Sequence, residues 1–121
     1  MKIDRAFVPL TEENFNDFDN GKDFELRKAE RGWTPKNIRT GRRVTVSCGY
    51  GTKRRIEGRI GQVIVGTLEE IFEKVAFKRI EPRARDRHHA RLMNIEILGN
   101  ASQYIAFEIK RIDQNKKRRS R

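Results

Sequence analysis

The chain has 121 residues, of which 36% are hydrophobic and 37% are charged, and its formal net charge at pH 7 is +11. This length predicts one domain with a modest core, and no segment approaches the ~20 apolar residues that a membrane-spanning helix needs. The opening residues, MKIDRAFVPL, carry no apolar signal region, and the single cysteine, Cys48, excludes an internal disulfide. We therefore expect a cytoplasmic protein with no membrane partner.

The first elements are short. Residues 6–10 predict a strand that ends near Pro9, and Thr11 predicts the N-cap of a helix over residues 12–20. Residues 23–29 alternate between apolar and charged types, which predicts a second strand with its apolar side chains facing the core and its charged ones facing the other way.

The middle of the chain predicts two further strands after a loop. The loop covers residues 31–41, and residues 43–48 (RVTVSC) alternate as a strand does. Residues 55–65 predict one long, bent strand, in which Gly58 and Gly61 mark bulges or a close approach of backbone.

Two helices and a closing strand are predicted in the last part of the chain. Thr67 and Glu70 form a capping box before an amphipathic stripe, which predicts a helix. Pro82 is expected to open another helix that ends near Gly99. The inner face of this second helix is expected to carry Ala84, His88, Leu92 and Ile95. Residues 103–112 alternate and predict the closing strand.

Mixed strands and helices, with long strands interrupted by glycine, favour an α+β domain built on a small open β-barrel. We expect this domain to cover residues 1–113. Residues 114–121 contain no apolar side chain and five positive charges, so we expect a basic disordered tail.

The stretch NGKDFELR places three charged residues at a predicted helix-to-strand corner. Glu25 and Arg27 point the same way on a strand, and Lys22 lies just ahead of them. These groups form either a surface ion pair, contributing ~0–1 kcal/mol, or the floor of a binding pocket. Spacing alone leaves both interpretations open.

The same stretch carries a resemblance to a known family. NGKDFELR, preceded by PLTEENFNDF and followed by KAERGW and IRTGRRVTV, resembles the opening of an ASCH domain. This family lies in the PUA-like superfamily, and the form here is most similar to small members from bacteria and phages. Lys22, Glu25 and Arg27 match its motif, whereas Asn20 stands in place of the motif glycine. The resemblance implies a PUA-like barrel of about five or six strands, two or three packed helices, and a cleft proposed to hold RNA or a nucleoside.

The resemblance also implies candidate catalytic residues. Some relatives are amidohydrolases of an acetylated cytidine and one is a ribonuclease. Lys22 matches their catalytic lysine, Glu25 replaces a useful threonine, and Glu81 corresponds to a later carboxylate. A lysine flanked by Asp23 and Glu25 is stabilised in its charged form, which suits binding of a phosphate or a base carbonyl better than nucleophilic attack.

Several basic and aromatic residues are candidates for nucleic-acid contact, because cations that neutralise phosphates release counterions. Trp33 and Tyr50 could stack on bases, although Trp33 could equally cap the barrel and Tyr50 lies in a predicted turn. The full candidate set is Lys22, Arg27, Trp33, Tyr50, Lys53, Arg54, Arg55, Arg83, Arg85, Arg87, Arg91, Lys116, Lys117, Arg118 and Arg119. A basic solvated surface is the alternative for the charged members.

Three function classes remain from the sequence. The first is a nucleic-acid-binding protein, with RNA favoured over DNA. The second is a hydrolase of a modified nucleoside or of RNA, and the third is a phage-type basic protein that binds a host protein. No metal or cofactor is expected, since His88 and His89 diverge by ~100° on a helix and no zinc-ligand pattern is present.

Overall fold

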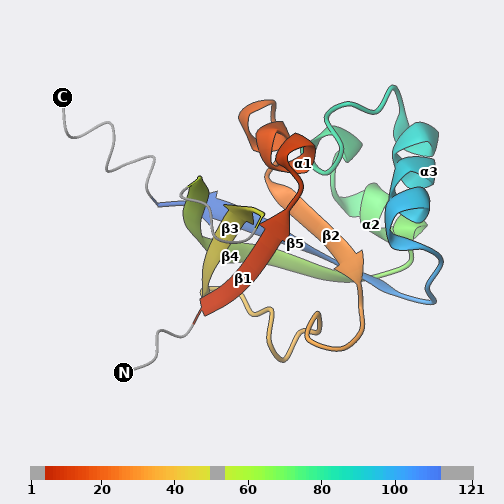
Figure 1. Ribbon diagram of the computed structural model, residues 1–121. Coiled ribbons are helices and arrows are strands. Elements are labelled where there is room, and N and C mark those ends of the chain that lie inside the picture. Colours follow the sequence, from red (N-terminus) through yellow and green to blue (C-terminus); the bar gives the residue numbers. More distant parts are fainter. Residues whose placement is uncertain (1–4, 50–53, 113–121) are drawn as a thin grey trace.

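Five strands form one mixed sheet in the order β1-β3-β4-β5-β2 (Figure 1). They are β1 (Arg5–Leu10), β2 (Phe24–Lys28), β3 (Arg43–Cys48), β4 (Arg55–Gly66) and β5 (Tyr104–Arg111). In this computed structural model, residues 5–49 and 54–112 are described. β1 pairs with β3 in parallel and the other neighbours are antiparallel. The sheet curves into a half-barrel whose open side lies between the edge strands β1 and β2.

Three α-helices and two 3-10 turns complete the fold. The helices are α1 (Glu12–Asn16), α2 (Leu68–Lys74) and α3 (Arg87–Leu98), and the turns are η1 (Asp17–Asp19) and η2 (Phe77–Arg79). α2 and α3 lie together beside β2, whereas α1 follows directly from the end of β1 (Figure 1). Thr11 caps α1, and the predicted capping box of Thr67 and Glu70 opens α2. The α+β small open barrel expected from the sequence is confirmed.

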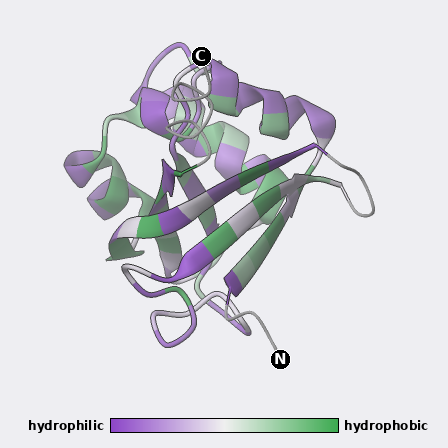
Figure 2. Cartoon of the chain, turned by 90° about the vertical axis from the view of Figure 1, so that its left-hand side faces the viewer, coloured by the Kyte–Doolittle hydropathy of each residue, from purple (hydrophilic) through white to green (hydrophobic). Residues whose placement is uncertain are grey.

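Two apolar clusters lie on opposite faces of the sheet. The first fills the half-barrel with side chains of β1, β3, β4 and β5, including Val8, Val44 and Phe107, and with Phe15 and Phe18 from α1 and η1. The second lies between the sheet and α2 and α3. The strands in Figure 2 are therefore striped, because hydrophobic and hydrophilic residues alternate along them.

An irregularity in β4 lets one strand contribute to both clusters. The register with β5 shifts between Ile60 and Val63, near the predicted bulge at Gly61. Ile60 consequently packs in the first cluster, whereas Ile64 packs in the second. A strict alternation would have kept both isoleucines on one face.

The predicted helix from Pro82 is wrong at its start. α3 begins at Arg87, because the side chain of Asp86 accepts a hydrogen bond from the backbone N–H of His89 and acts as the N-cap. The face of the helix that turns inward also differs from the expected one. Its buried residues are Ala90 and Asn94, whereas His88 and Leu92 are exposed and Ala84 is buried outside the helix.

Other expectations differ in detail or lie outside the described residues. The helix expected over residues 12–20 changes from α to 3-10 geometry at Asp17. Tyr50, Lys53 and the tail over 114–121 lie outside the described residues. Among the described helices, none is long and apolar enough to cross a membrane.

Candidate functional site

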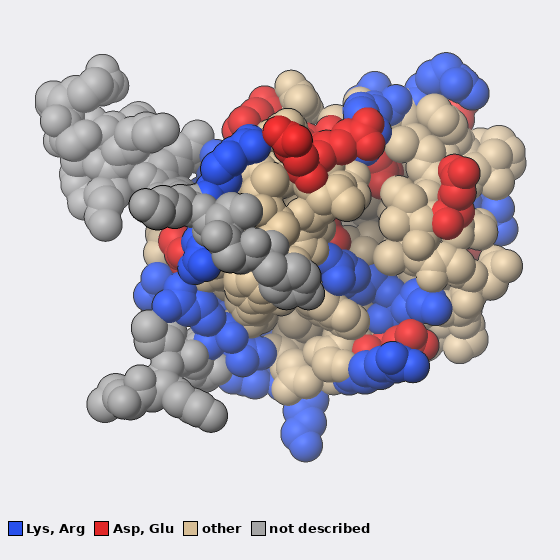
Figure 3. All heavy atoms as spheres, viewed as in Figure 1, with Lys and Arg blue, Asp and Glu red and all other residues tan. Residues whose placement is uncertain are grey.

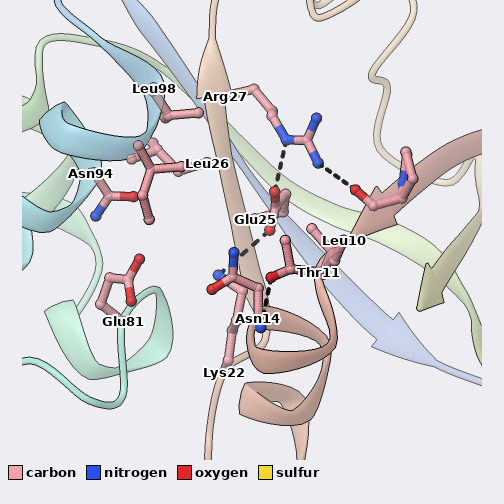
Figure 4. A pocket seen from close by; sticks show the side chains of 12 residues that line it. Leu10, Thr11, Asn14, Lys22, Glu25, Leu26, Arg27, Glu81, Asn94 and Leu98 are labelled. Carbon is pink, nitrogen blue, oxygen red and sulfur yellow. Dashed lines mark hydrogen bonds and ion pairs between the residues drawn. The ribbon is translucent and has the colours of Figure 1, made fainter. Parts of the chain in front are cut away.

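A pocket of about 230 Å³ lies at the open side of the half-barrel, where the end of β1 approaches β2 and α3. We call it the edge pocket. Its polar lining consists of Thr11, Asn14, Lys22, Glu25, Arg27, Glu81 and Asn94. Its apolar lining consists of Pro9, Leu10, Leu26, Ile97 and Leu98. Figure 4 shows Glu81 and Asn94 on one side of the hollow and Thr11, Asn14, Lys22 and Glu25 on the other.

The three motif residues form a chain of contacts in this pocket. One carboxylate oxygen of Glu25 lies 3.5 Å from Nζ of Lys22, and the other accepts a hydrogen bond of 2.7 Å from Nε of Arg27. The side chains of Lys22 and Glu25 are only 6% and 8% exposed. This is a buried network and not the surface ion pair that the sequence left open.

The position of Glu25 follows from the two-sided burial of β2. The preceding Phe24 and the following Leu26 face the second apolar cluster, so Glu25 and Arg27 turn toward the half-barrel. Arg27 crosses the opening, where its Nη2 donates to the backbone oxygen of Pro9 at 3.1 Å. One edge strand is thereby tied to the other next to the pocket.

The guanidinium of Arg27 packs against a pair of aromatic rings. Its guanidinium lies 4.4 Å from the ring centroid of Trp33, and Trp33 stacks on Phe107 with centroids 6.1 Å apart. These contacts give Trp33 a packing role in the half-barrel. Stacking of Trp33 on a nucleic-acid base stays a prediction.

Lys22 is positioned as a hydrogen-bond donor. Its Nζ donates to the backbone oxygen of Ile80 at 2.7 Å and faces Glu25. An ammonium group has three N–H donors, so one remains for a ligand in the edge pocket.

Glu81 brings an unsatisfied carboxyl group to the same hollow. The residue is 5% exposed, and its Oε1 is buried with no hydrogen-bond partner among the described residues. Burial raises the pKa of this carboxyl, and the positive charges of Lys22 and Arg83 oppose that shift only in part. A buried carboxyl with a spare oxygen can accept or donate a hydrogen bond at the site.

Asn94 was missed by the sequence analysis. Its amide nitrogen donates to the backbone oxygen of Ala90 at 2.7 Å, and its side chain borders the edge pocket opposite Lys22 (Figure 4). An asparagine between apolar residues on a helix is the only signal that the sequence offered, and a wrong helix start concealed it. Thr11 was missed because the pattern assigned it to a helix cap alone, and Asn14 was missed because it lay within the helix expected over residues 12–20.

Most of the predicted phosphate-binding arginines contact the protein itself. Arg83 forms hydrogen bonds with the buried carboxylate of Asp17, which raise the pKa of its guanidinium above the ordinary value. Arg91 pairs with Glu69, and Arg87 donates to the backbone oxygen of Phe72.

Arg54 contacts side chains of α1, as Arg83 does. Arg54 contacts Glu12 and Asn16, while Arg55 begins β4 and Arg85 precedes α3 as exposed residues. Contact of these arginines with nucleic acid stays a prediction. In the described ranges, no group of three or more His, Cys, Asp or Glu side chains is arranged to hold a metal ion.

Comparison with known proteins identifies the fold. No family model matches the sequence, and no curated protein matches it either. Among solved structures, the ASCH protein from Zymomonas mobilis superimposes with a TM-score of 0.61 at 15% identity, covering 98% of this chain and 81% of that one. The chain has the ASCH fold.

Two further structures share this ASCH fold over nearly their whole length. The hypothetical protein PH0355 has a TM-score of 0.70 at 17% identity, with 89% of this chain and 99% of that chain covered. Protein PF0455 from Pyrococcus furiosus has a TM-score of 0.62 at 16% identity, with coverages of 90% and 98%. The resemblance seen in the motif thus extends to the architecture of the whole chain.

Proposed function

We propose that this ASCH-fold protein binds nucleic acid, RNA in the first place, and takes one unpaired base into the edge pocket. The observation that carries the proposal is the set of unsatisfied polar groups around a small hollow. Lys22 offers a free N–H donor, and the carboxyl of Glu81 offers an oxygen without a partner. A base edge presents donors and acceptors together and would satisfy both groups.

The size and the apolar walls of the pocket support a single base. Its volume of about 230 Å³ is below the ~300–1,000 Å³ typical of drug-sized ligands. Leu10, Leu26 and Leu98 supply apolar surface for the faces of a ring. Sequence-specific RNA recognition usually reads bases that are splayed out of single strands, which is why RNA is favoured over DNA.

Binding is tested with labelled eight-nucleotide RNA and DNA single strands, by fluorescence anisotropy at ~50 mM salt. Lys22→Met removes the free donor but keeps the chain length, and a hydrogen bond to a charged group contributes ~1.5–3 kcal/mol. We expect a loss of about 10- to 100-fold in affinity. Lys74→Met removes an exposed charge on α2 and should leave the affinity nearly unchanged.

Two results would contradict the proposal. The first is absence of binding to every strand by the native chain, and the second is equal affinity of Lys22→Met and Lys74→Met. Circular dichroism establishes whether the variants fold. If Lys22→Met does not fold, Glu81→Gln serves as a second pocket variant. A protein partner that survives nuclease treatment in a pull-down, together with absent nucleic-acid binding, would favour the host-protein alternative.

A second candidate function is hydrolysis of an acylated base, and one observation favours it. Lys22, Glu25 and Glu81, the candidates for catalysis, border the same hollow, and Glu81 has a raised pKa that suits general acid–base chemistry. Glu81 would take a proton from water as the water adds to the acyl carbonyl, while Lys22 donates to the carbonyl oxygen. The C–N bond to the base nitrogen then breaks and the proton passes to that nitrogen.

Hydrolysis is separated from binding by product analysis with N4-acetylcytidine and with unmodified RNA. Loss of a general acid–base group lowers the rate ~10²–10⁴-fold. Glu81→Gln should therefore reduce the rate of turnover by a much larger factor than it reduces the affinity. Absence of product from both substrates would exclude the hydrolase candidate and leave the binding proposal intact.

A further inference from the structure

A row of four cationic residues crosses four neighbouring strands. It runs from the start of β1, the end of that strand away from the edge pocket, to Lys110 of β5, which lines a hollow together with Lys22. The strand registers place Arg5 beside Arg43, Arg43 beside Arg59, and Arg59 beside Lys110. Neighbouring strands are ~4.8 Å apart, so this cationic row spans about 14 Å.

All four side chains belong to the face that turns away from the interior of the half-barrel. Their chain neighbours Ala6, Val44, Ile60 and Ile109 pack in the first apolar cluster, and successive residues of a strand point to opposite faces. Figure 3 shows Lys and Arg atoms gathered at the lower left, where β1 begins, and Asp and Glu atoms gathered at the top over α1.

Among the described residues, three members of the row have no acidic partner. Arg5 pairs with Glu57 at 3.2 Å, but no carboxylate of the described residues forms an ion pair with Arg43, Arg59 or Lys110. Nε of Arg43 is buried without a hydrogen-bond partner among those residues. Like charges directly opposite one another on adjacent strands destabilise a sheet. An anion across the row would relieve this repulsion and satisfy Nε.

The turn before β3 adds a concave wall to the row. Gly41 has a positive φ of 93°, and its backbone oxygen accepts a hydrogen bond of 2.9 Å from Nη1 of Arg59. The resulting hollow, of about 370 Å³, is bordered by Arg39, Thr40, Gly41, Arg42, Arg43 and Arg59. A concave surface with four guanidinium groups suits phosphate oxygens, which guanidinium binds in a bidentate manner.

We propose that the cationic row and this hollow bind the phosphate backbone of the nucleic acid whose base enters the edge pocket. The inference rests on the proposed function for the identity of the polyanion. Arg5 and its neighbour Arg43 lie at the start of β1 and the edge pocket at its end, about 17 Å apart along the six-residue strand. A single nucleotide reaches only one of the two sites, whereas a longer strand reaches both.

The test compares a ribonucleoside monophosphate with a ten-nucleotide RNA single strand, over ~50–200 mM salt. The double variant Arg43→Gln/Arg59→Gln removes two unpaired charges. Each lost phosphate contact should reduce the slope of log K against log salt by ~0.7, so we expect a reduction of about 1.4 for the ten-nucleotide strand. Affinity for the monophosphate should stay unchanged.

The matched control is Lys74→Gln/Lys78→Gln, which removes the same charge from exposed positions of α2 and η2. It should keep the native salt slope. The inference is overturned if Arg43→Gln/Arg59→Gln keeps the native slope while the native chain binds RNA, or if it weakens binding of the monophosphate equally. If the native chain binds no strand at ~50 mM salt, the proposed function itself fails, which is a distinguishable result.

Discussion

At the scale of single residues, the edge pocket brings together side chains whose chemistry depends on burial. Glu25 lies between Lys22 and Arg27, so its charge is balanced on both sides. Glu81 has no such hydrogen-bonded partner, and burial raises the pKa of its carboxyl. The pocket therefore holds one balanced carboxylate and one carboxyl that lowers stability when it ionises.

This difference predicts a pH-dependent effect of Glu81→Gln on stability. A raised folded-state pKa means that the folded chain binds the proton more tightly than the unfolded chain, whose carboxyl has an ordinary pKa near 4.5. The stabilising contribution of the protonated carboxyl is complete below that value and is lost as the pH rises through the folded-state pKa. Glu81→Gln should therefore gain thermal stability relative to the native chain between pH 4 and pH 7.

Thermal unfolding at several pH values between 4 and 7 checks this prediction. Glu73→Gln, which removes an exposed carboxyl on α2, is the control for the loss of one negative charge. A constant difference between Glu81→Gln and the native chain would show that ionisation of Glu81 does not oppose folding.

At the scale of elements, β4 is the strand that shapes the half-barrel. It runs from Arg55 to Gly66, pairs with both β3 and β5, and shifts register near Gly61. Gly58 lies on β4 opposite Arg111 of β5. A Cβ atom at this position would be 2.6 Å from the backbone oxygen of Lys110. Glycine is needed here because the backbone oxygen of Lys110 cannot move away from an added Cβ atom as the end of a flexible side chain could.

We therefore expect Gly58→Ala to destabilise the fold by about 1–3 kcal/mol, the usual cost of forcing atoms into a packed site. Gly32→Ala is the matched control, because a Cβ atom there meets nothing within 4 Å. The control should change the free energy of unfolding by no more than ~0.5 kcal/mol. Chemical denaturation measures both variants, and similar losses for the two would contradict the close-approach argument.

At the scale of the whole molecule, positive and negative charges are distributed unevenly. The described body carries the cationic row across four strands of the sheet and a cluster of acidic side chains over α1 (Figure 3). Five of the eleven excess positive charges belong to residues 114–121, outside the described residues. Binding of a polyanion should thus have one component from the folded surface and another from the tail sequence.

Removal of residues 114–121 separates these components, since the net charge falls to +6. We expect a uniform loss of affinity for single strands and a salt slope smaller by at most ~3.5, at ~0.7 for each of five lost contacts. The preference among bases should stay the same, because the edge pocket is intact. Anisotropy titrations with strands of different base composition measure both quantities, and an altered base preference would contradict the separation.

The sequence by itself determined the class of fold and the place of the motif. Alternation predicted the strands, capping residues predicted α1 and α2, and NGKDFELR indicated the ASCH architecture, because these signals depend on residues close together in the chain. Local pattern failed for α3. The side chain of Asp86 sets its start, and packing of the helix against the second apolar cluster turns Asn94 inward and leaves His88 exposed.

Only the tertiary structure decided which charges meet. Glu81 is 56 residues from Glu25, and both border one hollow because β2, η2 and α3 converge there. The cationic row likewise depends on strand registers that join Arg5, Arg43, Arg59 and Lys110. Burial and pairing between distant segments determine whether a charge is balanced, and no local pattern encodes them.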